Sequence, residues 1–206
     1  MLQYIFELLF PSFCINCNTK GKMLCISCAK SIFRALPHEL SWVRPLYNYQ
    51  NPIVKKIIKD AKYHHKTQGY IELIQYIRPE VLNFIQKRDF KNYIAIPAPQ
   101  HISKTNMRGF NQAEKLAHTL FDTSFITIDT NIITKIKPTT PQAQIHTRSV
   151  RLKNTQYSMQ ANKICDTDTL YILVDDVITT GGTMKEMHRA LSARGAKHII
   201  GITLAH

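Results

Sequence analysis

The stretch that decides the fold runs Tyr171-Ile-Leu-Val-Asp-Asp-Val-Ile-Thr-Thr-Gly-Gly-Thr183. Its apolar start predicts a buried strand, and two adjacent carboxylates, Asp175 and Asp176, follow at the carboxyl end of that strand. A loop of threonines and glycines comes next, and a helix is expected from Met184 to about Arg194. Open α/β sheets bind ligands beyond the carboxyl ends of their strands, so this loop is the first candidate site.

The residue types of this stretch suit a ligand that carries both a phosphate and a diol. Glycine lets backbone N–H groups approach an anion closely, threonine hydroxyls add donors, and a helix N-terminus adds unpaired N–H groups. Ionised carboxylates only accept hydrogen bonds, so Asp175 and Asp176 suit sugar hydroxyls. A ribose 5-phosphate fits this arrangement. The P-loop lysine is missing, and the acids precede the glycines, unlike in a dinucleotide-binding fingerprint. Thr183 and Glu186 have the spacing of a capping box for the following helix.

Strands and helices alternate along most of the chain, which predicts a parallel α/β sheet. Buried strands are expected at Tyr93 to Ile96 and His198 to Leu204, with shorter strand pieces at 126–128 and 132–134. Asn51-Pro52 predicts the start of one helix, a second is expected from about Tyr70 to Ile85, and Asn111 opens a third. Gly195 is expected to end the helix that follows the threonine and glycine loop.

Four of the five cysteines form two C-x-x-C pairs: Cys14, Cys17, Cys25 and Cys28. Two such pairs can each hold one edge of a tetrahedral Zn²⁺, and four protein ligands leave no open position, which indicates a structural site. Another metal or cluster is an alternative, as are two disulfides, which are rare in cytosolic chains. We interpret residues 1–45 as a zinc-binding N-terminal domain and residues 46–206 as the domain that carries the phosphate-type loop.

The chain is strongly basic, with 27 Lys and Arg against 14 Asp and Glu and a formal net charge of +13. Such a balance favours a polyanionic partner: phosphate, nucleic acid or an anionic membrane surface. Hydrophobic residues make up 44% of the 206 residues, which excludes wholesale disorder. No apolar run approaches the roughly 18 residues that a membrane-spanning helix needs. We therefore expect a cytoplasmic protein without an integral membrane segment.

Two basic stretches are candidates for contact with nucleic acid. Lysines line one side of the helix predicted after Asn51, and they form either a solvated face or a track for phosphates. The interval between Asp129 and Asp166 contains basic but no acidic residues. Single-strand binders combine a cationic groove with stacking aromatic side chains. The candidate contacts are Lys55, Lys56, Lys59, Lys62, Lys66, Arg148, Arg151 and Lys153.

The stretch 171–183 resembles the phosphoribosyl-pyrophosphate (PRPP) motif of type I phosphoribosyltransferases. Further segments occur in an order that resembles the ComF family of natural-competence proteins, and the resemblance covers nearly the whole chain. It implies a type I phosphoribosyltransferase-like parallel sheet flanked by helices, with a small N-terminal zinc-binding domain that uses four cysteines. The matching segments are Phe10-Pro11-Ser12-Phe13-Cys14 with the double C-x-x-C, Lys59 to Tyr63, Ile96 to Pro99, Arg108 to Glu114, Thr139 to Gln144 and Arg148 to Asn154.

The resemblance also implies roles for individual residues. Asp175 and Asp176 would hold the ribose hydroxyls and, with Arg108, form the catalytic set. The loop after the strand Tyr93 to Ile96, with Ala98 and Pro99, would cradle the pyrophosphate, and the Arg108 guanidinium would grip its oxygens in a bidentate fork. Mg²⁺ would accompany PRPP, held by its oxygens and by water. The 5′-phosphate would lie on Thr179, Thr180, Gly181, Gly182 and Thr183.

The same resemblance implies a role in DNA uptake for natural transformation. Single-stranded DNA and a competence helicase or translocation machinery would be partners, with recruitment to the inner face of the membrane as a further possibility. A rival hypothesis is an active phosphoribosyltransferase that acts on a nucleobase or another acceptor, and a second is a binding module with a vestigial PRPP loop. No grouping of aromatic and amide side chains indicates a site for a nucleobase acceptor. The sequence therefore does not decide whether PRPP is a substrate that the protein turns over.

Overall fold

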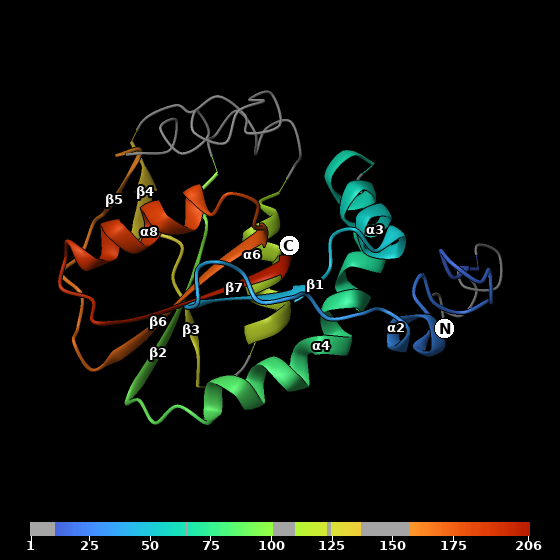
Figure 1. The fold of residues 1–206 in the computed structure, drawn as a ribbon, viewed down its shortest axis with the longest axis horizontal. Coiled ribbons are helices and arrows are strands. Elements are labelled where there is room, and N and C mark those ends of the chain that lie inside the picture. The colour runs from blue at the N-terminus through green and yellow to red at the C-terminus, as the bar shows by residue number, and fades with distance from the viewer. Residues whose placement is uncertain (1–10, 65, 101–109, 123–124, 137–156) are drawn as a thin grey trace, which may run out of the picture.

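The computed structural model describes residues 11–64, 66–100, 110–122, 125–136 and 157–206. The strands in these ranges form a five-stranded sheet in the order β1-β7-β6-β2-β3, in which every pairing is parallel (Figure 1). This confirms the predicted parallel α/β sheet. The strands are β1 (Val43–Tyr47), β2 (Asn92–Pro97), β3 (Thr127–Ile128), β6 (Thr169–Val177) and β7 (His198–Ala205).

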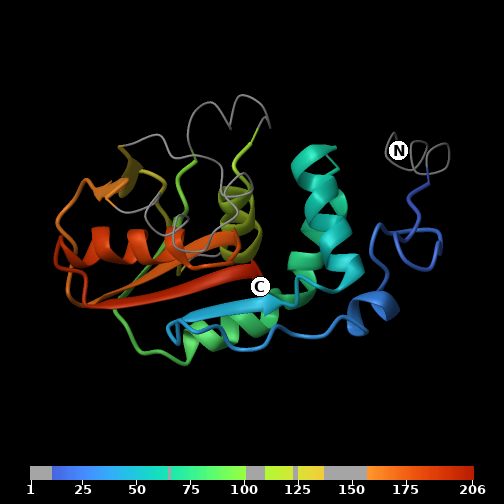
Figure 2. The ribbon, with the colours of Figure 1, turned by 45° about the horizontal axis from the view of Figure 1, so that its top comes forward.

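Helices cover both faces of the sheet because the side chains of a strand alternate between the two faces. Along β6, Ile172 and Val174 join the core beneath α3 (Pro52–Tyr63), α4 (Gln68–Gln86) and α6 (Gln112–Phe121). Tyr171 and Leu173 instead join the core beneath α8 (Gly182–Ser192). Figure 2 shows α8 and α4 on opposite sides of the sheet. The centre of β6 is therefore buried on both faces, and its carboxyl end carries the acids.

A second, two-stranded sheet pairs β4 (Ile133–Lys135) with β5 (Met159–Ala161) in antiparallel fashion next to α8. Residues 132–134 were expected to form a strand piece, and β4 confirms it, but outside the main sheet. The strand piece expected at 126–128 corresponds to β3, at the edge of the main sheet.

Two of the predicted helix starts are confirmed by their caps. The Asn51 side chain accepts hydrogen bonds from the N–H groups of Ile53 (3.0 Å) and Val54 (3.3 Å) at the start of α3. The Asn111 side chain accepts one from the Ala113 N–H (3.0 Å) at the start of α6. Both caps satisfy donors that have no partner within their helix.

The capping box expected at Thr183 and Glu186 is wrong. The N-cap of α8 is Gly181, in the left-handed conformation with φ 72°, and this residue has no side chain with which to cap the helix. Helix α8 begins before Thr183, and Glu186 lies on its buried face. Glu186 there accepts from the Met159 N–H of β5 (3.2 Å) and pairs with Arg189 at 2.8 Å. The far end follows the prediction, with Gly195 at φ 97° just after α8.

The N-terminal part of the described chain contains the cysteines, the short helix α2 (Ile26–Lys30) and then β1. The domain boundary predicted between residues 45 and 46 falls inside β1. Pro45 is buried and lies opposite Thr203 of β7. Proline is tolerated there because β1 is an edge strand and needs no N–H on its outer side. None of the helices within the described residues has both the length and the apolar character required to span a lipid bilayer.

Candidate functional site

The two acids lie at the carboxyl end of β6, between strands β7 and β2. Each is oriented by the backbone that follows it: Asp175 Oδ1 accepts from the Asp176 N–H (2.8 Å), and Asp176 Oδ1 accepts from the Val177 N–H (2.7 Å). Asp175 lies in register with Thr203 of β7. The structure thus brings both carboxylates to the edge of the sheet where the sequence predicted a ligand.

Helices α3 and α4 bring two further groups to these acids. The Lys62 ammonium of α3 forms an ion pair with Asp176 Oδ2, and the two side chains are only 18% and 16% exposed. Tyr70 of α4 is fully buried, and its hydroxyl donates to the Gln112 carbonyl at 3.4 Å. Burial, followed by the charges of Asp176 and Asp175, raises the pKa of Tyr70 well above its usual value. Lys62, grouped by sequence with the DNA contacts, is therefore part of the acid cluster.

The environment of Asp175 opposes its ionisation. Burial, and next the negative charge of Asp176, raise the pKa of Asp175 to about 7, while the Asp176 N–H and Lys62 act in the other direction. At neutral pH the Asp175 carboxyl is therefore close to the midpoint of its own titration. The hydroxyl groups of a diol need hydrogen-bond acceptors, and an ionised carboxylate is such an acceptor. A cation that binds together with the ligand would favour the ionised form of Asp175.

The loop between β6 and α8 has the features of an anion site. Its N-cap residue Gly181 has φ 72°, and the first N–H groups of α8 have no partner within the helix. The Thr180 hydroxyl is buried, and among the described residues it has no hydrogen-bond partner; the same holds for the Thr203 hydroxyl beside Asp175. Unpaired buried donors at a helix N-terminus are what a phosphate would satisfy.

The predicted pyrophosphate loop follows β2, the strand next to β6. The Ala98 N–H donates to the Val174 carbonyl (2.7 Å), and the Ala98 carbonyl accepts from the Asn111 side chain (3.0 Å). Pro99 has no N–H to offer. The loop therefore lies beside the acids, but in this conformation neither Ala98 nor Pro99 presents a donor to an anion. Arg108, expected to grip the pyrophosphate, lies outside the described residues.

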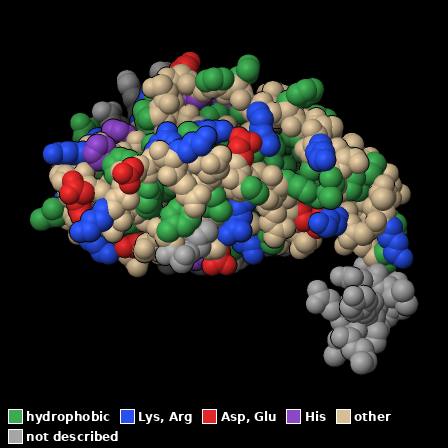
Figure 3. Space-filling model, turned by 90° about the horizontal axis from the view of Figure 1, so that it is seen from below, with side chains coloured by type: hydrophobic (Ala, Val, Ile, Leu, Met, Phe, Trp, Pro, Cys, Tyr) green, Lys and Arg blue, Asp and Glu red, His purple; other side chains and the backbone are tan. Residues whose placement is uncertain are grey.

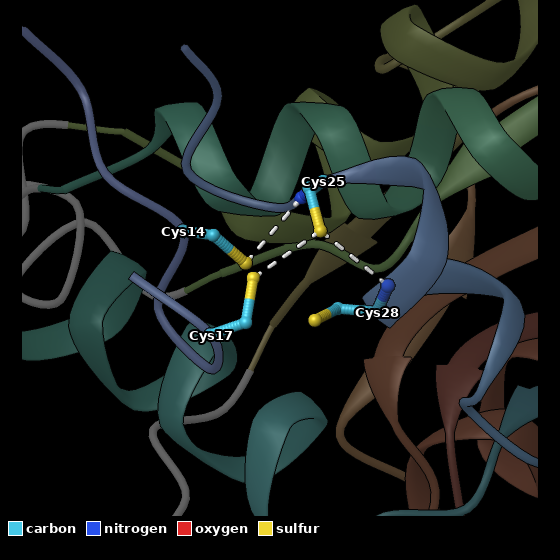
Figure 4. Close-up of side chains that lie close together, drawn as sticks. All are labelled: Cys14, Cys17, Cys25 and Cys28. Carbon is cyan, nitrogen blue, oxygen red and sulfur yellow. Dashed lines mark hydrogen bonds between the residues drawn. The ribbon is translucent and has the colours of Figure 1, made fainter. Parts of the chain in front are cut away.

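The four cysteines predicted to bind metal do converge. Their sulfur atoms all lie within 4.8 Å of one another (Figure 4). Tetrahedral Zn²⁺ with bonds of about 2.3 Å separates its sulfur ligands by about 3.8 Å, so the cluster has the size of such a site. All five cysteines of the chain lie in the described ranges, and none is in a disulfide. The donor set can hold a metal ion, in agreement with the predicted metal site.

Hydrogen bonds and charge crowding both act on these thiols. Burial opposes ionisation of Cys14, but nearby backbone N–H groups lower the pKa of its thiol to about 6. The Asn16 amide donates to the Cys28 sulfur (3.2 Å) and lowers its pKa, yet the other cysteine sulfurs and burial together raise the pKa of Cys28 to about 12. Four thiolates repel one another at this spacing, and a bound cation would remove that conflict.

Two side chains of helix α4 form hydrogen bonds to the backbone beside the cysteine cluster. The Glu72 carboxylate accepts from the Leu24 N–H at 2.7 Å, and the Tyr76 hydroxyl donates to the Leu24 carbonyl at 3.1 Å. Leu24 directly precedes Cys25 and is fully buried. The charges of Asp175 and Asp176 act on Tyr70 of the same helix, so α4 lies near both the cysteine cluster and the acid cluster.

The predicted DNA contacts are only partly described. Lys56, Lys59 and Lys66 are exposed, and Lys55 is half-buried. Arg148, Arg151 and Lys153 lie outside the described residues. On the face shown in Figure 3, Lys and Arg side chains lie in several separate groups with Asp and Glu side chains between them.

A cavity of about 620 Å³ lies elsewhere, at the amino ends of β2 and β6, and its lining includes Asn92, Tyr93 and Thr169. The acids lie at the opposite ends of the same sheet. The cavity is therefore separate from the candidate site, whose chemistry rests on the acids and the loop.

Comparison with known proteins finds the following similarities. Residues 106–206 match the phosphoribosyl transferase domain family. A stretch of 106 residues is 34% identical to competence protein F of Haemophilus influenzae and covers 50% of this chain and 46% of that protein, so the chain spans about half the length of this curated relative. A solved hypoxanthine phosphoribosyltransferase from Staphylococcus aureus has a TM-score of 0.38 and 16% identity, covering 65% of this chain and 63% of that one. The first two matches confirm the predicted resemblance to ComF-family proteins and phosphoribosyltransferases.

Proposed function

We propose that this protein is a phosphoribosyltransferase-like member of the ComF family and that it binds PRPP at the carboxyl end of β6. One observation carries the proposal: a pair of carboxylates and the loop that contains Thr180 meet at the same end of one buried strand, and the buried Thr180 hydroxyl has no hydrogen-bond partner in the described part of the chain. The carboxylates suit the ribose diol, and the loop at the N-terminus of α8 suits the 5′-phosphate. A ribose 5-phosphate group needs both at once.

The proposed roles follow the chemistry of each group. Asp175 and Asp176 accept hydrogen bonds from the 2′- and 3′-hydroxyls, and Lys62 balances the charge of Asp176. The pyrophosphate lies toward residues 97–99, with Arg108 as its cation. Mg²⁺ would be held by PRPP oxygens and water, since that ion keeps much of its hydration. The 5′-phosphate is assigned to Thr179, Thr180, Gly181, Gly182 and Thr183.

Calorimetric titration of Mg·PRPP tests the site with two matched variants. Asp175→Asn removes a charge from the site, while Asp168→Asn makes the same change at an exposed position just before β6. We expect Asp175→Asn to abolish measurable binding and Asp168→Asn to leave it unchanged. Wild-type protein that does not bind, or folded Asp175→Asn that binds equally well, would refute the proposal. A pyrophosphate-release assay with a panel of nucleobases, run on the same samples, separates a PRPP-binding protein from an active transferase.

The proposal extends to the handling of single-stranded DNA during natural transformation, in the cytoplasm and together with a competence helicase or translocation machinery. Its support is the similarity to a protein named competence protein F, the formal net charge of +13 and the exposed lysines of α3. Binding that neutralises phosphates releases counterions, so affinity should fall steeply with salt. We expect Lys56→Gln with Lys59→Gln to weaken binding of an oligonucleotide and to flatten its salt dependence. A salt-independent affinity would contradict this part of the proposal.

We also assign a structural Zn²⁺ to Cys14, Cys17, Cys25 and Cys28. The spacing of their sulfurs and the N–H groups that point at them support this assignment. Metal analysis of protein purified without chelator should find one zinc per chain. Iron in place of zinc, or no metal at all, would overturn the assignment.

A further inference from the structure

A short segment between the cysteine cluster and β1 lies against the phosphate-type loop. His38, in this segment, is buried with 8% of its surface exposed. Its Nε2 lies 3.3 Å from the carbonyl oxygen of Thr179, the first threonine of the loop. A residue remote in sequence thus contacts the backbone of the candidate 5′-phosphate site.

The two partners of the His38 ring determine which nitrogen carries the proton. The Leu40 N–H donates to Nδ1 at 3.0 Å, so Nδ1 must be an acceptor. In the neutral ring the hydrogen then lies on Nε2, which donates to the Thr179 carbonyl. The His206 ring stands edge-on to His38, with centroids 4.6 Å apart and an interplanar angle of 80°. The ring is therefore held between a turn of its own segment, an aromatic neighbour and the loop.

The same segment packs closely against the loop at Gly181. A Cβ added to Gly181 would lie 2.7 Å from Leu40 Cδ1 and 3.5 Å from His38 Cε1. Gly181 also has φ 72°, which disfavours any residue with a side chain. The backbone of the loop at Gly181 therefore packs against the side chains of His38 and Leu40 too closely to leave room for a Cβ.

Peptide geometry gives this contact a consequence for anion binding. In a planar trans peptide the carbonyl and the following N–H point in opposite directions. When His38 holds the Thr179 carbonyl, the Thr180 N–H must point to the other side of the loop. With that peptide turned over, a carbonyl oxygen would take the place of a donor and would repel a phosphate.

We infer that His38 is a positioning residue for the 5′-phosphate loop: its Nε2–H holds the Thr179 carbonyl, so that the Thr180 N–H faces the bound phosphate. This inference rests on the proposed PRPP function. It does not make His38 a catalytic residue, because its effect passes through the Thr179–Thr180 peptide. It predicts that the 5′-phosphate part of the ligand depends on His38 and that the pyrophosphate part does not.

Two variants separate the two hydrogen bonds of the ring. In His38→Asn, the side-chain oxygen lies near the position of Nδ1 and keeps the bond from Leu40, but the side chain is too short to reach Thr179. In His38→Gln, the amide nitrogen lies near the position of Nε2 and restores the donor to Thr179. The local turn and the contact with the loop can thus be removed one at a time.

The experiment titrates both variants and the wild type with Mg·PRPP, with ribose 5-phosphate and with pyrophosphate alone. A neutral hydrogen bond is worth about a three- to tenfold change in an equilibrium. We expect His38→Asn to weaken PRPP and ribose 5-phosphate by that factor and to leave pyrophosphate unchanged. His38→Gln should bind all three ligands as tightly as the wild type.

Each other outcome has a definite meaning. Wild-type protein that binds neither PRPP nor ribose 5-phosphate refutes the proposed function, and the inference with it. Wild-type binding with an unaffected His38→Asn refutes the inference alone. Equal losses for pyrophosphate and ribose 5-phosphate also refute it, because they indicate a general structural role. If His38→Asn folds poorly, amide hydrogen exchange at Thr180 in His38→Gln decides: protection below the wild-type level would overturn the inference.

Discussion

Replacing Asp175 by Asn should stabilise the protein at pH 8 while it removes PRPP binding. The pKa of Asp175 is raised from 3.8 to about 7 by burial and by the charge of Asp176. Between these values the folded state keeps a proton that the unfolded state releases. The free energy of unfolding therefore falls as the pH rises through this range, and the loss is complete above pH 7.

The size of the effect follows from the shift. One pKa unit corresponds to about 1.4 kcal/mol, so the full shift sets an upper limit of about 4 kcal/mol. Asp175 is only half-buried, and solvent screening reduces the cost, so we expect about 2 kcal/mol. Asparagine removes the buried charge, and its oxygen can still accept from the Asp176 N–H, which the aspartate does at 2.8 Å. For a chain of this size the gain corresponds to a rise in Tm of about 4–8 °C.

Thermal unfolding of the wild type, Asp175→Asn and the exposed control Asp168→Asn, each at pH 8 and pH 4, tests this reasoning. The stabilisation by Asp175→Asn should appear at pH 8 and shrink toward zero at pH 4, where the wild-type carboxyl is protonated in the folded state. Asp168→Asn should change Tm little at either pH. If Asp175→Asn were less stable than the wild type at pH 8, or if it gained equal stability at pH 4, then ionisation of Asp175 would not lower the free energy of unfolding. A gain in stability at the expense of binding is the usual trade-off at functional sites.

Three further predictions concern the groups around the two sites. Lys62→Met should enlarge the stabilisation by Asp175→Asn, because the charge of Lys62 lowers the pKa of Asp175. The stabilisation should be unchanged in the control Lys59→Met, and an unchanged value in Lys62→Met would contradict the effect of Lys62 on Asp175. Gly181→Ala should lower the free energy of unfolding by about 1–2 kcal/mol and weaken PRPP binding, since alanine is strained in the left-handed region. Gly195→Ala, strained for the same reason but remote from the loop, should lower stability alone, and equal effects on PRPP binding would refute the argument. Cys17→Ser should lose the bound metal and lower Tm, as metal analysis and thermal unfolding would show, whereas Cys165→Ser should retain the metal.

Much of the fold was predictable because its signals are local. A buried strand that ends in two acids, and helix starts marked by Asn51 and Asn111, depend only on residues near one another in sequence. The capping box at Thr183 and Glu186 failed although its spacing was right. A buried partner in β5 and an ion pair with Arg189 compete for the Glu186 carboxylate, and neither can be read from the spacing of four residues. Strand β1 was missed because it is short, contains Pro45 and is paired in the main sheet with β7, which lies far away in sequence.

The sequence by itself determined the chemistry of each motif: two acids before a glycine turn, and four thiols at metal-binding spacing. Only the tertiary structure decided which distant side chains act on them. From the sequence, Lys62 was one of the candidate DNA contacts, and only the packing of α3 placed it against Asp176. His38 carried no signal, since its role depends on a carbonyl far along the chain. The physical reason is that a sequence motif determines only the donors and acceptors along one strand and one turn. The charge balance, the burial and the peptide orientation of that turn depend on the distant segments that pack against it.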